Sequence, residues 1–203
     1  MRAIHLMAVG ASGRGEPDLA IELLDHLAAA LARVFHVSCH VSTAALNAAV
    51  ALDPDRRQYH STLILRAMTP LAPDPGIRLL GVTELDLFVP VLTFVFGEAQ
   101  LGGACGLVSV RRLREEFYGL PANPALLSQR LVKEALHELG HTFGLRHCPN
   151  WQCVMASTHA VERLDLKEAQ YCPACSSGMA FRVMPQAFRI SPLWGRPFGL
   201  PSH

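Results

Sequence analysis

Apolar positions recur along the first half of the chain with two different periods. Across residues 16–33, leucines return every three or four positions, as they do on one face of a helix, and Pro17 stands at an early helical position. Alternation of strands and helices in this half predicts a partly parallel sheet. Strand-like patterns cover residues 1–9, 34–41, 61–68 and 77–83, and a second helical pattern covers residues 43–52.

Two further segments complete the predicted sheet region. Residues 86–96 are strongly apolar and are expected to be mostly buried, although Pro90 interrupts them. Residues 101–110 combine three glycines with a short β-prone run. Glycine in a strand often marks a place where another group comes close, so this run predicts an approached edge strand.

One long helix is predicted after the sheet region. Asn123 is a good N-cap, Pro124 suits the first helical position, and Gly144 marks the end. Beyond it we expect mainly loops to about residue 176, with a short helix near residues 160–169. An irregular tail is expected over residues 186–203 because prolines recur there.

The composition fits one compact globular unit, because half of the 203 residues are hydrophobic and few are charged. We therefore predict an α/β (α+β) fold with a mixed sheet and packed helices. Residues 1–144 are expected to form an N-terminal subdomain with the sheet and the long helix. Residues 145–203 are expected to form a smaller, loop-rich subdomain.

The charge pattern bears on the partners. Eighteen Lys and Arg residues oppose seventeen Asp and Glu residues, and the net charge of +1 gives no field that would gather nucleic acid or an anionic membrane. No apolar run is long enough to span a bilayer. We expect a monomer in the reducing cytosol that binds neither nucleic acid nor membrane.

A metal site is predicted on the long helix. His137 and His141 differ by about 40° around the helix axis, so their imidazoles point the same way. Leu136 and Leu139 point toward the core instead. Glu138 lies beside the metal-binding face, where a carboxylate can take a proton from a zinc-bound water and return it to the leaving amine.

The residues after this helix extend the motif. Gly144 permits a sharp turn, so that His147 can swing back as a third ligand. HExxH alone also occurs by chance on surface helices, but the added glycine and histidine make that interpretation improbable. Three protein ligands leave zinc a fourth position for water, which is typical of a catalytic site.

Four of the six cysteines form a second cluster at residues 148–175. Four thiolates can close a tetrahedral structural zinc site. A redox dithiol is the alternative for the CxxC pair, but two more cysteines nearby favour zinc. The cluster begins next to His147, so a structural zinc would fix the loop that supplies the third catalytic ligand. Its members are Cys148, Cys153, Cys172 and Cys175.

The run HELGHTFGLRHC at residues 137–148, followed by Cys153, Met155 and a later CxxC, resembles the archaemetzincins, a family of metzincin-clan zinc metallopeptidases. The resemblance implies a zincin/metzincin-like fold, with Met155 as the Met-turn residue beneath the catalytic zinc. Without it, Met155 would read as an ordinary core methionine. The resemblance also implies a substrate-binding edge strand at Gly103, Ala104, Cys105 and Gly106.

These patterns together predict a metallopeptidase that holds two Zn²⁺ ions, one catalytic and one structural, and acts on a peptide or protein substrate. The alternative is a zinc protein that binds peptides or chain termini with little turnover. An intact Glu138 beside an open zinc favours hydrolysis. The sequence leaves endopeptidase and aminopeptidase action open, because that difference lies in the shape of the cleft.

Overall fold

The structure is a computed structural model that describes residues 1–11, 19–72 and 74–183. The predicted tail at residues 186–203 and the start of the first predicted helix lie outside these residues. The elements are β1 (Ala3–Gly10), α1 (Ile21–Phe35), β2 (Ser38–Asn47), β3 (Leu52–Asp53), β4 (Gln58–His60), α2 (Ser61–Met68), β5 (Ile77–Thr83), β6 (Leu87–Phe88), β7 (Gly97–Ala99), β8 (Cys105–Ser109), α3 (Pro124–Thr142), α4 (Val161–Leu166) and α5 (Pro173–Val183).

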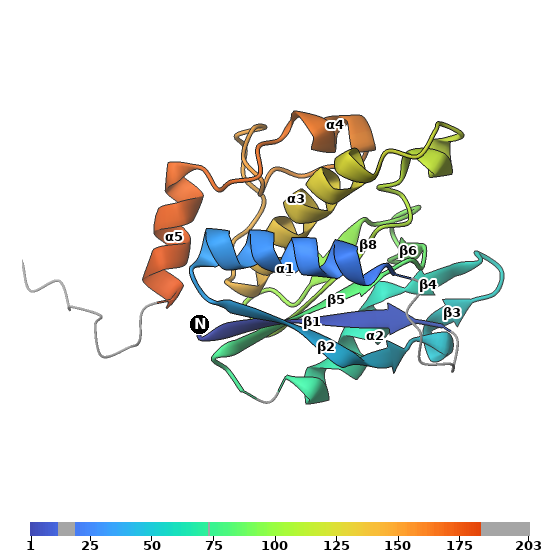
Figure 1. Cartoon of the computed structure of the whole chain (residues 1–203), viewed down its shortest axis with the longest axis horizontal. Helices are drawn as coiled ribbons and strands as arrows, with labels where there is room; N and C mark the ends of the chain where they lie inside the picture. The colour runs from blue at the N-terminus through green and yellow to red at the C-terminus, as the bar shows by residue number, and fades with distance from the viewer. Residues whose placement is uncertain (12–18, 73, 184–203) are drawn as a thin grey trace, which may run out of the picture.

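A five-stranded mixed sheet with the order β2-β1-β5-β8-β7 forms the centre of the molecule. Neighbours among β2, β1, β5 and β8 pair in parallel, whereas β7 runs antiparallel to β8. A small second sheet of β3, β4 and β6 lies on the right of Figure 1. The predicted α/β class and the partly parallel sheet are confirmed.

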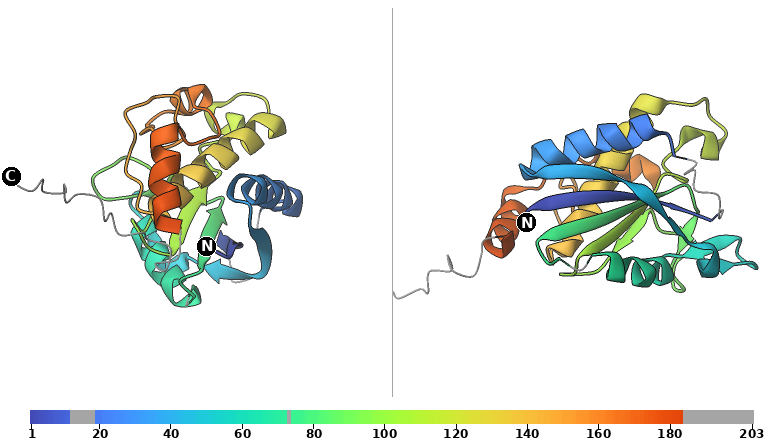
Figure 2. Two further views of the ribbon diagram at one scale, coloured as in Figure 1. Left: turned by 90° about the vertical axis from the view of Figure 1, so that its left-hand side faces the viewer. Right: turned by 60° about the horizontal axis from the view of Figure 1, so that its bottom comes forward.

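Helices cover both faces of the sheet. α1 and α3 pack on one face and α2 on the other, as the two views in Figure 2 also show. Neighbouring residues of a strand point to opposite faces, so β8 supplies both cores. Val108 joins Leu136 and the α1 side chains in one cluster, and Leu107 joins Ile64 and Met68 in the other.

Two predicted elements are wrong in type. Residues 61–68 form helix α2 and not a strand: Ser61, Ile64, Leu65 and Met68 are buried at helical spacing. Residues 43–47 belong to β2 and not to a helix, and only a short 3-10 turn follows at Ala49–Ala51. Parallel pairing with β1 supplies the backbone hydrogen bonds of β2 and outweighs the helix propensity of its alanines.

The predicted edge strand is also corrected. Cys105 and Gly106 lie in β8, which has β5 on one side and β7 on the other, and Gly103 and Ala104 precede it in the connection from β7. The edge is β7, whose three residues are too short to give a sequence signal. Side chains do approach Gly106: a Cβ atom there would lie 3.2 Å from Leu80 Cδ1 on β5 and 3.4 Å from Glu138 Cβ on α3.

The segment at residues 86–96 is buried only at its ends. Leu87, Phe88 and Phe96 are buried, but Val91 is 88% exposed and Leu92 is also exposed. Polar contacts hold this segment in place: the Arg56 guanidinium donates to the carbonyl oxygens of Leu92 and Thr93. The prediction of a mostly buried segment is therefore wrong in the middle.

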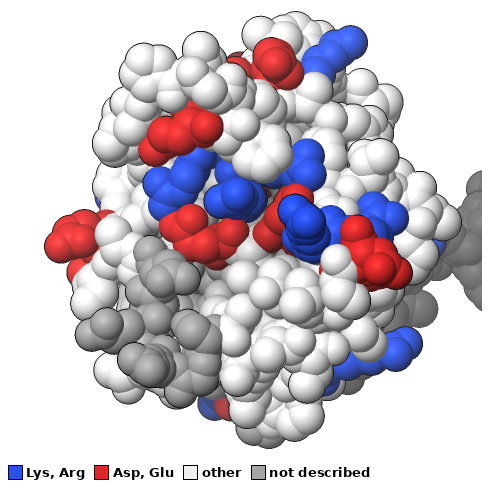
Figure 3. Space-filling model, turned by 90° about the vertical axis from the view of Figure 1, so that its right-hand side faces the viewer, with Lys and Arg blue, Asp and Glu red and all other residues white. Residues whose placement is uncertain are grey.

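Ion pairs join the loops that follow the parallel strands. Arg112 forms a bidentate pair with Asp86, and Arg114 pairs with Glu84. Figure 3 shows a face on which Lys and Arg side chains lie directly beside Asp and Glu side chains. Charges of both signs are thus mixed on this face.

The C-terminal part shares its core with the sheet region. Met155, Val154 and Leu164 belong to the same buried cluster as Leu136 and Leu139 of α3. The predicted short helix is confirmed as α4, but α5 already begins at Pro173, within the predicted loop region. The division into subdomains at residues 144 and 145 stays a prediction. Within the described ranges, no helix is long and apolar enough to cross a membrane.

Candidate active site

Helix α3 begins and ends as the sequence predicts. The Asn123 side chain accepts a hydrogen bond from the Leu126 N–H group at 3.1 Å, and Pro124 occupies the first position. At the other end Gly144 has φ of +78°, and its N–H donates to the His141 carbonyl at 2.7 Å. A residue with a Cβ atom rarely adopts this φ, so the glycine permits the turn toward His147.

The three predicted histidines converge. The Nε2 atoms of His137 and His141 are 3.1 Å apart. The His147 ring stacks on that of His137 with centroids 5.3 Å apart, and one nitrogen from each of the three rings lies within 4.8 Å of the others. Three nitrogens at this spacing can surround one ion with bonds of about 2 Å.

Backbone carbonyls fix the protonation of two of these rings. His137 Nδ1 lies 2.8 Å from the Val154 oxygen, and His141 Nδ1 lies 2.8 Å from the Leu145 oxygen. A carbonyl only accepts, so both Nδ1 atoms carry the proton and both Nε2 lone pairs face each other. Two facing lone pairs repel each other unless a cation binds them, so the donor set fits a metal ion.

Burial keeps these histidines neutral. It lowers the pKa of His137 to about 3, and the nearby Lys167 ammonium adds to the shift. Burial also lowers the pKa of His141 and of the exposed His147, although the Leu145 carbonyl opposes the shift at His141. Neutral imidazole is the form that binds a metal.

Glu138 lies beside the histidines with its carboxylate over strand β7. A Cβ atom on Gly97 would lie 2.6 Å from Glu138 Oε1, so only glycine leaves room for the carboxylate there. Glu138 is 4% exposed, and its Oε2 atom has no hydrogen-bond partner among the described residues. Burial, with Glu134 and Glu98 nearby, raises the pKa of Glu138 well above its ordinary value.

A cleft of about 790 Å³ opens on these side chains. β7 and the segment before it form one wall, and the loop at Ser157, Thr158 and His159 contributes another part of the lining. The predicted peptide-binding residues 103–106 do not line this cleft, whereas residues 92–99 do. The edge that a substrate can reach is therefore β7.

Met155 lies under the histidine-bearing turn of α3. It is fully buried, and a Cβ atom on Gly140 would overlap its Sδ atom, so helix and methionine are in close contact. Its carbonyl accepts a hydrogen bond from the Cys148 N–H at 2.9 Å, which ties the loop after His147 back to this residue. Its position thus fits the role that the resemblance implies.

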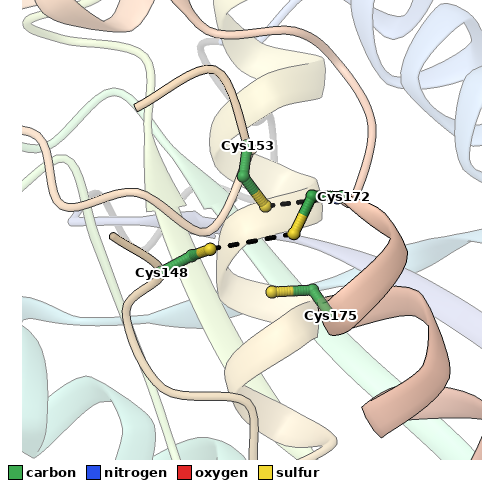
Figure 4. A group of neighbouring side chains, drawn as sticks. All are labelled: Cys148, Cys153, Cys172 and Cys175. Atoms are coloured by element: carbon green, nitrogen blue, oxygen red, sulfur yellow. Dashed lines mark hydrogen bonds between the residues drawn. The ribbon is translucent and has the colours of Figure 1, made fainter. Parts of the chain in front are cut away.

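The four clustered cysteines come together as predicted. Figure 4 shows Cys148 and Cys153 from the loop after α3 facing Cys172 and Cys175 at the start of α5. All four Sγ atoms lie within 4.8 Å of one another, and those of Cys148 and Cys172 are 3.8 Å apart. All four are free thiols, so the geometry fits a tetrahedral metal site.

Backbone N–H groups donate to the sulfur atoms of Cys153 and Cys172, and at Cys172 they favour the thiolate form. The Cys172 N–H donates to Cys153 Sγ at 3.3 Å. A hydrogen bond from the Cys175 backbone lowers the pKa of the Cys172 thiol to about 7. Burial raises the pKa of the Cys148 and Cys175 thiols, so Cys172 is the thiol best prepared to bind a cation as the thiolate that metal ligation requires.

Sequence reasoning missed four charged residues that line the cleft: Glu98, Glu134, Arg146 and Lys167. Glu134 could have been found, because it precedes His137 and Glu138 at helical spacing and makes this face of α3 continuously polar. Lys167 and Glu98 come from other parts of the chain and gave no signal.

Two tyrosines that could assist catalysis are engaged elsewhere. The Tyr171 hydroxyl donates to the Leu136 carbonyl at 2.6 Å, and the Tyr118 hydroxyl donates to the Arg112 carbonyl at 2.9 Å. Neither residue lines the cleft.

The HExxH helix, the third histidine after a glycine turn and the open cleft define the class of protein: a zinc metallopeptidase of the metzincin type. The model of peptidase family M54 matches residues 68–180, more than half of the chain. The chain therefore belongs to peptidase family M54, the archaemetzincins.

Individual relatives agree with this assignment. The archaemetzincin of Methanocaldococcus jannaschii is 48% identical over 120 residues, which cover 59% of this chain and 65% of that protein. The crystal structure of the Archaeoglobus fulgidus archaemetzincin, complexed with malonate, has a TM-score of 0.72 and 34% identity over 87% of this chain and 99% of that one. A zinc-dependent peptidase from Methanocorpusculum labreanum gives a TM-score of 0.74 and 28% identity, with the same coverage of both chains.

Proposed function

We propose that this protein hydrolyses peptide bonds with one zinc ion at His137, His141 and His147 and with Glu138 as the general base. The observation that carries the proposal is the pair of facing Nε2 lone pairs, which require a cation, next to a buried carboxylate in an open cleft. The structural relative named as a zinc-dependent peptidase supports zinc as the ion.

The chemistry divides between metal and protein. Zinc, when bound, would polarise the scissile carbonyl and acidify water. Glu138 accepts the proton of the attacking water at its carboxylate and gives it to the departing nitrogen. Burial suits this shuttle, because a carboxyl group in a dry site holds the proton until a basic nitrogen takes it. A cation held by the histidines would oppose this rise in pKa and would keep the Glu138 carboxylate able to act as a base.

A second zinc ion is proposed at Cys148, Cys153, Cys172 and Cys175. Four thiolates close the coordination shell and leave no place for substrate, so this ion has a structural role. Cys148 follows His147 directly, and its N–H bonds the carbonyl of Met155. The second ion thereby holds the third histidine and Met155, the proposed Met-turn residue, in place.

The substrate is proposed to lie along β7, residues Gly97–Ala99. Among the residues that the structure describes, β7 pairs with β8 alone, so its other edge can bond an extended peptide. Strand addition is a common way for a protein to bind an extended peptide without reading most of its side chains. Action on a peptide or protein substrate, a monomeric state and a location in the cytosol remain predictions.

The test is digestion of a peptide library, read by mass spectrometry, with the wild-type protein and the Glu138→Ala variant. We expect hydrolysis to fall by about 10²–10⁴-fold in the variant, because the base is gone, while both zinc ions remain bound. Glu22→Ala, which removes an exposed carboxylate on α1, is the matched control and should cleave normally.

Equal cleavage by Glu138→Ala would refute the role of Glu138. Absence of cleavage by the wild type, with tight peptide binding to the zinc-loaded protein, would support the alternative of a zinc protein that binds peptides or chain termini. Elemental analysis of zinc in each sample separates loss of catalysis from loss of metal.

A further inference from the structure

The cleft contains an acid and a base that the proposed mechanism does not use. Glu134 lies on α3, and Lys167 follows α4. Both line the cleft, and each is only 4% exposed. Burying a charge is unfavourable unless it is paired and hydrogen-bonded, so two such groups in one cleft need an explanation.

Neither group is fully bonded. Glu134 Oε1 has no hydrogen-bond partner among the described residues. Within residues 1–11, 19–72 and 74–183, Lys167 Nζ donates only one long bond, 3.4 Å, to the Val154 carbonyl, although an ammonium group has three donors. None of the ion pairs found in the described part of the chain includes Glu134 or Lys167. The cleft thus offers one free acceptor and free donors.

Both groups lie next to His137. Glu134 precedes it by three residues on α3, less than one helical turn. Lys167 Nζ bonds the same Val154 carbonyl that accepts the His137 Nδ1 proton. A ligand held by both groups would therefore lie immediately beside the metal-binding site and not at the far end of the cleft.

We propose that Glu134 and Lys167 form a substrate subsite that binds the carboxamide side chain of a Gln or Asn residue flanking the scissile bond. A carboxamide donates through its NH₂ group to Glu134 and accepts through its oxygen from Lys167, so it satisfies both groups at once. This inference rests on the proposed peptidase function.

Other side chains fit the pair less well. A Lys or Arg side chain would pair with Glu134 but would be repelled by Lys167. An Asp or Glu side chain would pair with Lys167 but would be repelled by Glu134. An apolar side chain would leave both buried groups unpaired. Unpaired buried polar groups disfavour binding strongly, so the site should reject an apolar ligand. The opposite charges of the pair thus select a neutral ligand with both a donor and an acceptor.

The subsite can be tested by binding, independently of turnover. Zinc-loaded Glu138→Ala protein is titrated with fluorescent peptides that share one sequence and differ only at a single residue, in two sets, with that residue in the N-terminal half of the peptide in one set and in the C-terminal half in the other. We expect Gln to bind at least about tenfold more tightly than Glu, Lys or Leu in one of the two sets, measured by fluorescence anisotropy. Equal binding, or a preference for Leu, would overturn the proposal.

Charge variants of the subsite give a second, directional test. Lys167→Met leaves Glu134 alone, so the preference should move toward Lys. Glu134→Leu leaves Lys167 alone, so the preference should move toward Glu. Glu162→Gln, an exposed carboxylate on α4 outside the cleft lining, is the control and should not change it.

The outcomes separate the two proposals. A shift in the same direction in both charge variants would mean general disruption and would contradict the subsite. If Gln selectivity holds in binding but the wild type cleaves nothing, the peptidase proposal fails and the subsite stands. If the wild type cleaves peptides without a Gln or Asn preference on either side, the subsite fails and the peptidase proposal stands.

Discussion

The histidine cluster and the cysteine cluster are suited to hold metals in different ways, although they lie next to each other in the chain. Within each cluster, the candidate ligand atoms lie within 4.8 Å of one another. The histidines offer three ligand atoms and open on a cleft, whereas the cysteines offer four that face one another and could enclose an ion. The first arrangement leaves room for a reactant and the second does not.

The clusters also differ in what holds their ligands. Carbonyl oxygens orient His137 and His141 from outside the site, so much of the histidine geometry exists without metal. The cysteine ligands come from two segments, which are joined by backbone hydrogen bonds from Val154 to Gln170 and from Glu168 to Gln152 as well as by the contact between the Cys148 and Cys172 thiols. Val154, which orients His137, and Met155, which bonds Cys148, both lie between these segments. The histidine site should therefore depend on the cysteine site more than the reverse.

The largest effect is expected from Cys153→Ser, which tests this dependence directly. Loss of one thiolate should release the structural zinc, whose binding contributes on the order of 10 kcal/mol to folding in comparable sites. We expect zinc content to fall at both sites and the melting temperature to drop by about 10 °C or more. Cys39→Ser, the same chemical change on β2, should keep both ions; full zinc content in Cys153→Ser would contradict the dependence.

The converse change, His147→Ala, should affect one site only. Loss of a residue that is hydrogen-bonded to a zinc ligand lowers the affinity for zinc about 10–100-fold. Loss of the ligand itself should therefore lower the affinity further. We expect one zinc ion per chain, held at the cysteine cluster, and no hydrolysis. The melting temperature should be near that of the wild-type protein with zinc at its cysteine cluster. Release of the second ion in this variant would show that the two sites depend on each other equally.

The sequence predicted both clusters because their information is local. His137 and His141 lie one turn apart, Gly144 marks the reversal, and Cys172 and Cys175 form a CxxC pair, so short spacings define the ligands. The long helix followed from its cap and its apolar face. Such features depend little on the rest of the fold.

The parts that were missed depend on long-range packing. The apolar residues of 61–68 fit a buried strand or a helix, and only packing on the sheet distinguishes the two. β2 is a strand because β1 lies beside it, and β7 is an edge because β8 returns next to it. Lys167 enters the cleft from a loop after α4, which no spacing rule connects to the HExxH motif.

A rate effect without metal loss is expected from Gly97→Ala. The added methyl group would lie 2.6 Å from both Glu138 Oε1 and the Leu107 carbonyl oxygen, so the carboxylate must move and the backbones of β7 and β8 must also shift. Displacement of a catalytic group by about 1 Å can lower the rate about 100-fold. We expect that loss in kcat, with zinc content unchanged at both clusters.

Gly10→Ala is the matched control for this substitution, because a Cβ atom there meets nothing within 4 Å. It should leave kcat unaltered. Wild-type turnover by Gly97→Ala would mean that Glu138 has room to rearrange, and the steric account of its position would then be wrong.

The smallest expected effect is on the pH dependence of stability, and it involves Glu134 beside the histidine cluster and not the cysteine cluster. Burial raises the pKa of Glu134 to about 7, above its unfolded value near 4.5, although Lys167 opposes the shift. The folded protein thus holds this proton more tightly than the unfolded chain, so stability is lost as pH rises from about 4.5 to 7. Glu134→Gln keeps the shape without the charge. It should stabilise the zinc-loaded protein by about 1 kcal/mol at pH 8 and hardly at pH 5.

Thermal unfolding of the two proteins at both pH values measures this difference. Glu162→Gln, which removes an exposed carboxylate, should shift the melting temperature equally at pH 5 and pH 8. A stabilisation of Glu134→Gln that is larger at pH 5 would reverse the expected sign and would mean that the carboxylate is paired in the folded protein. Because a Gln side chain on a bound peptide should also pair with Glu134, that peptide is expected to stabilise the wild type more than the variant at pH 8.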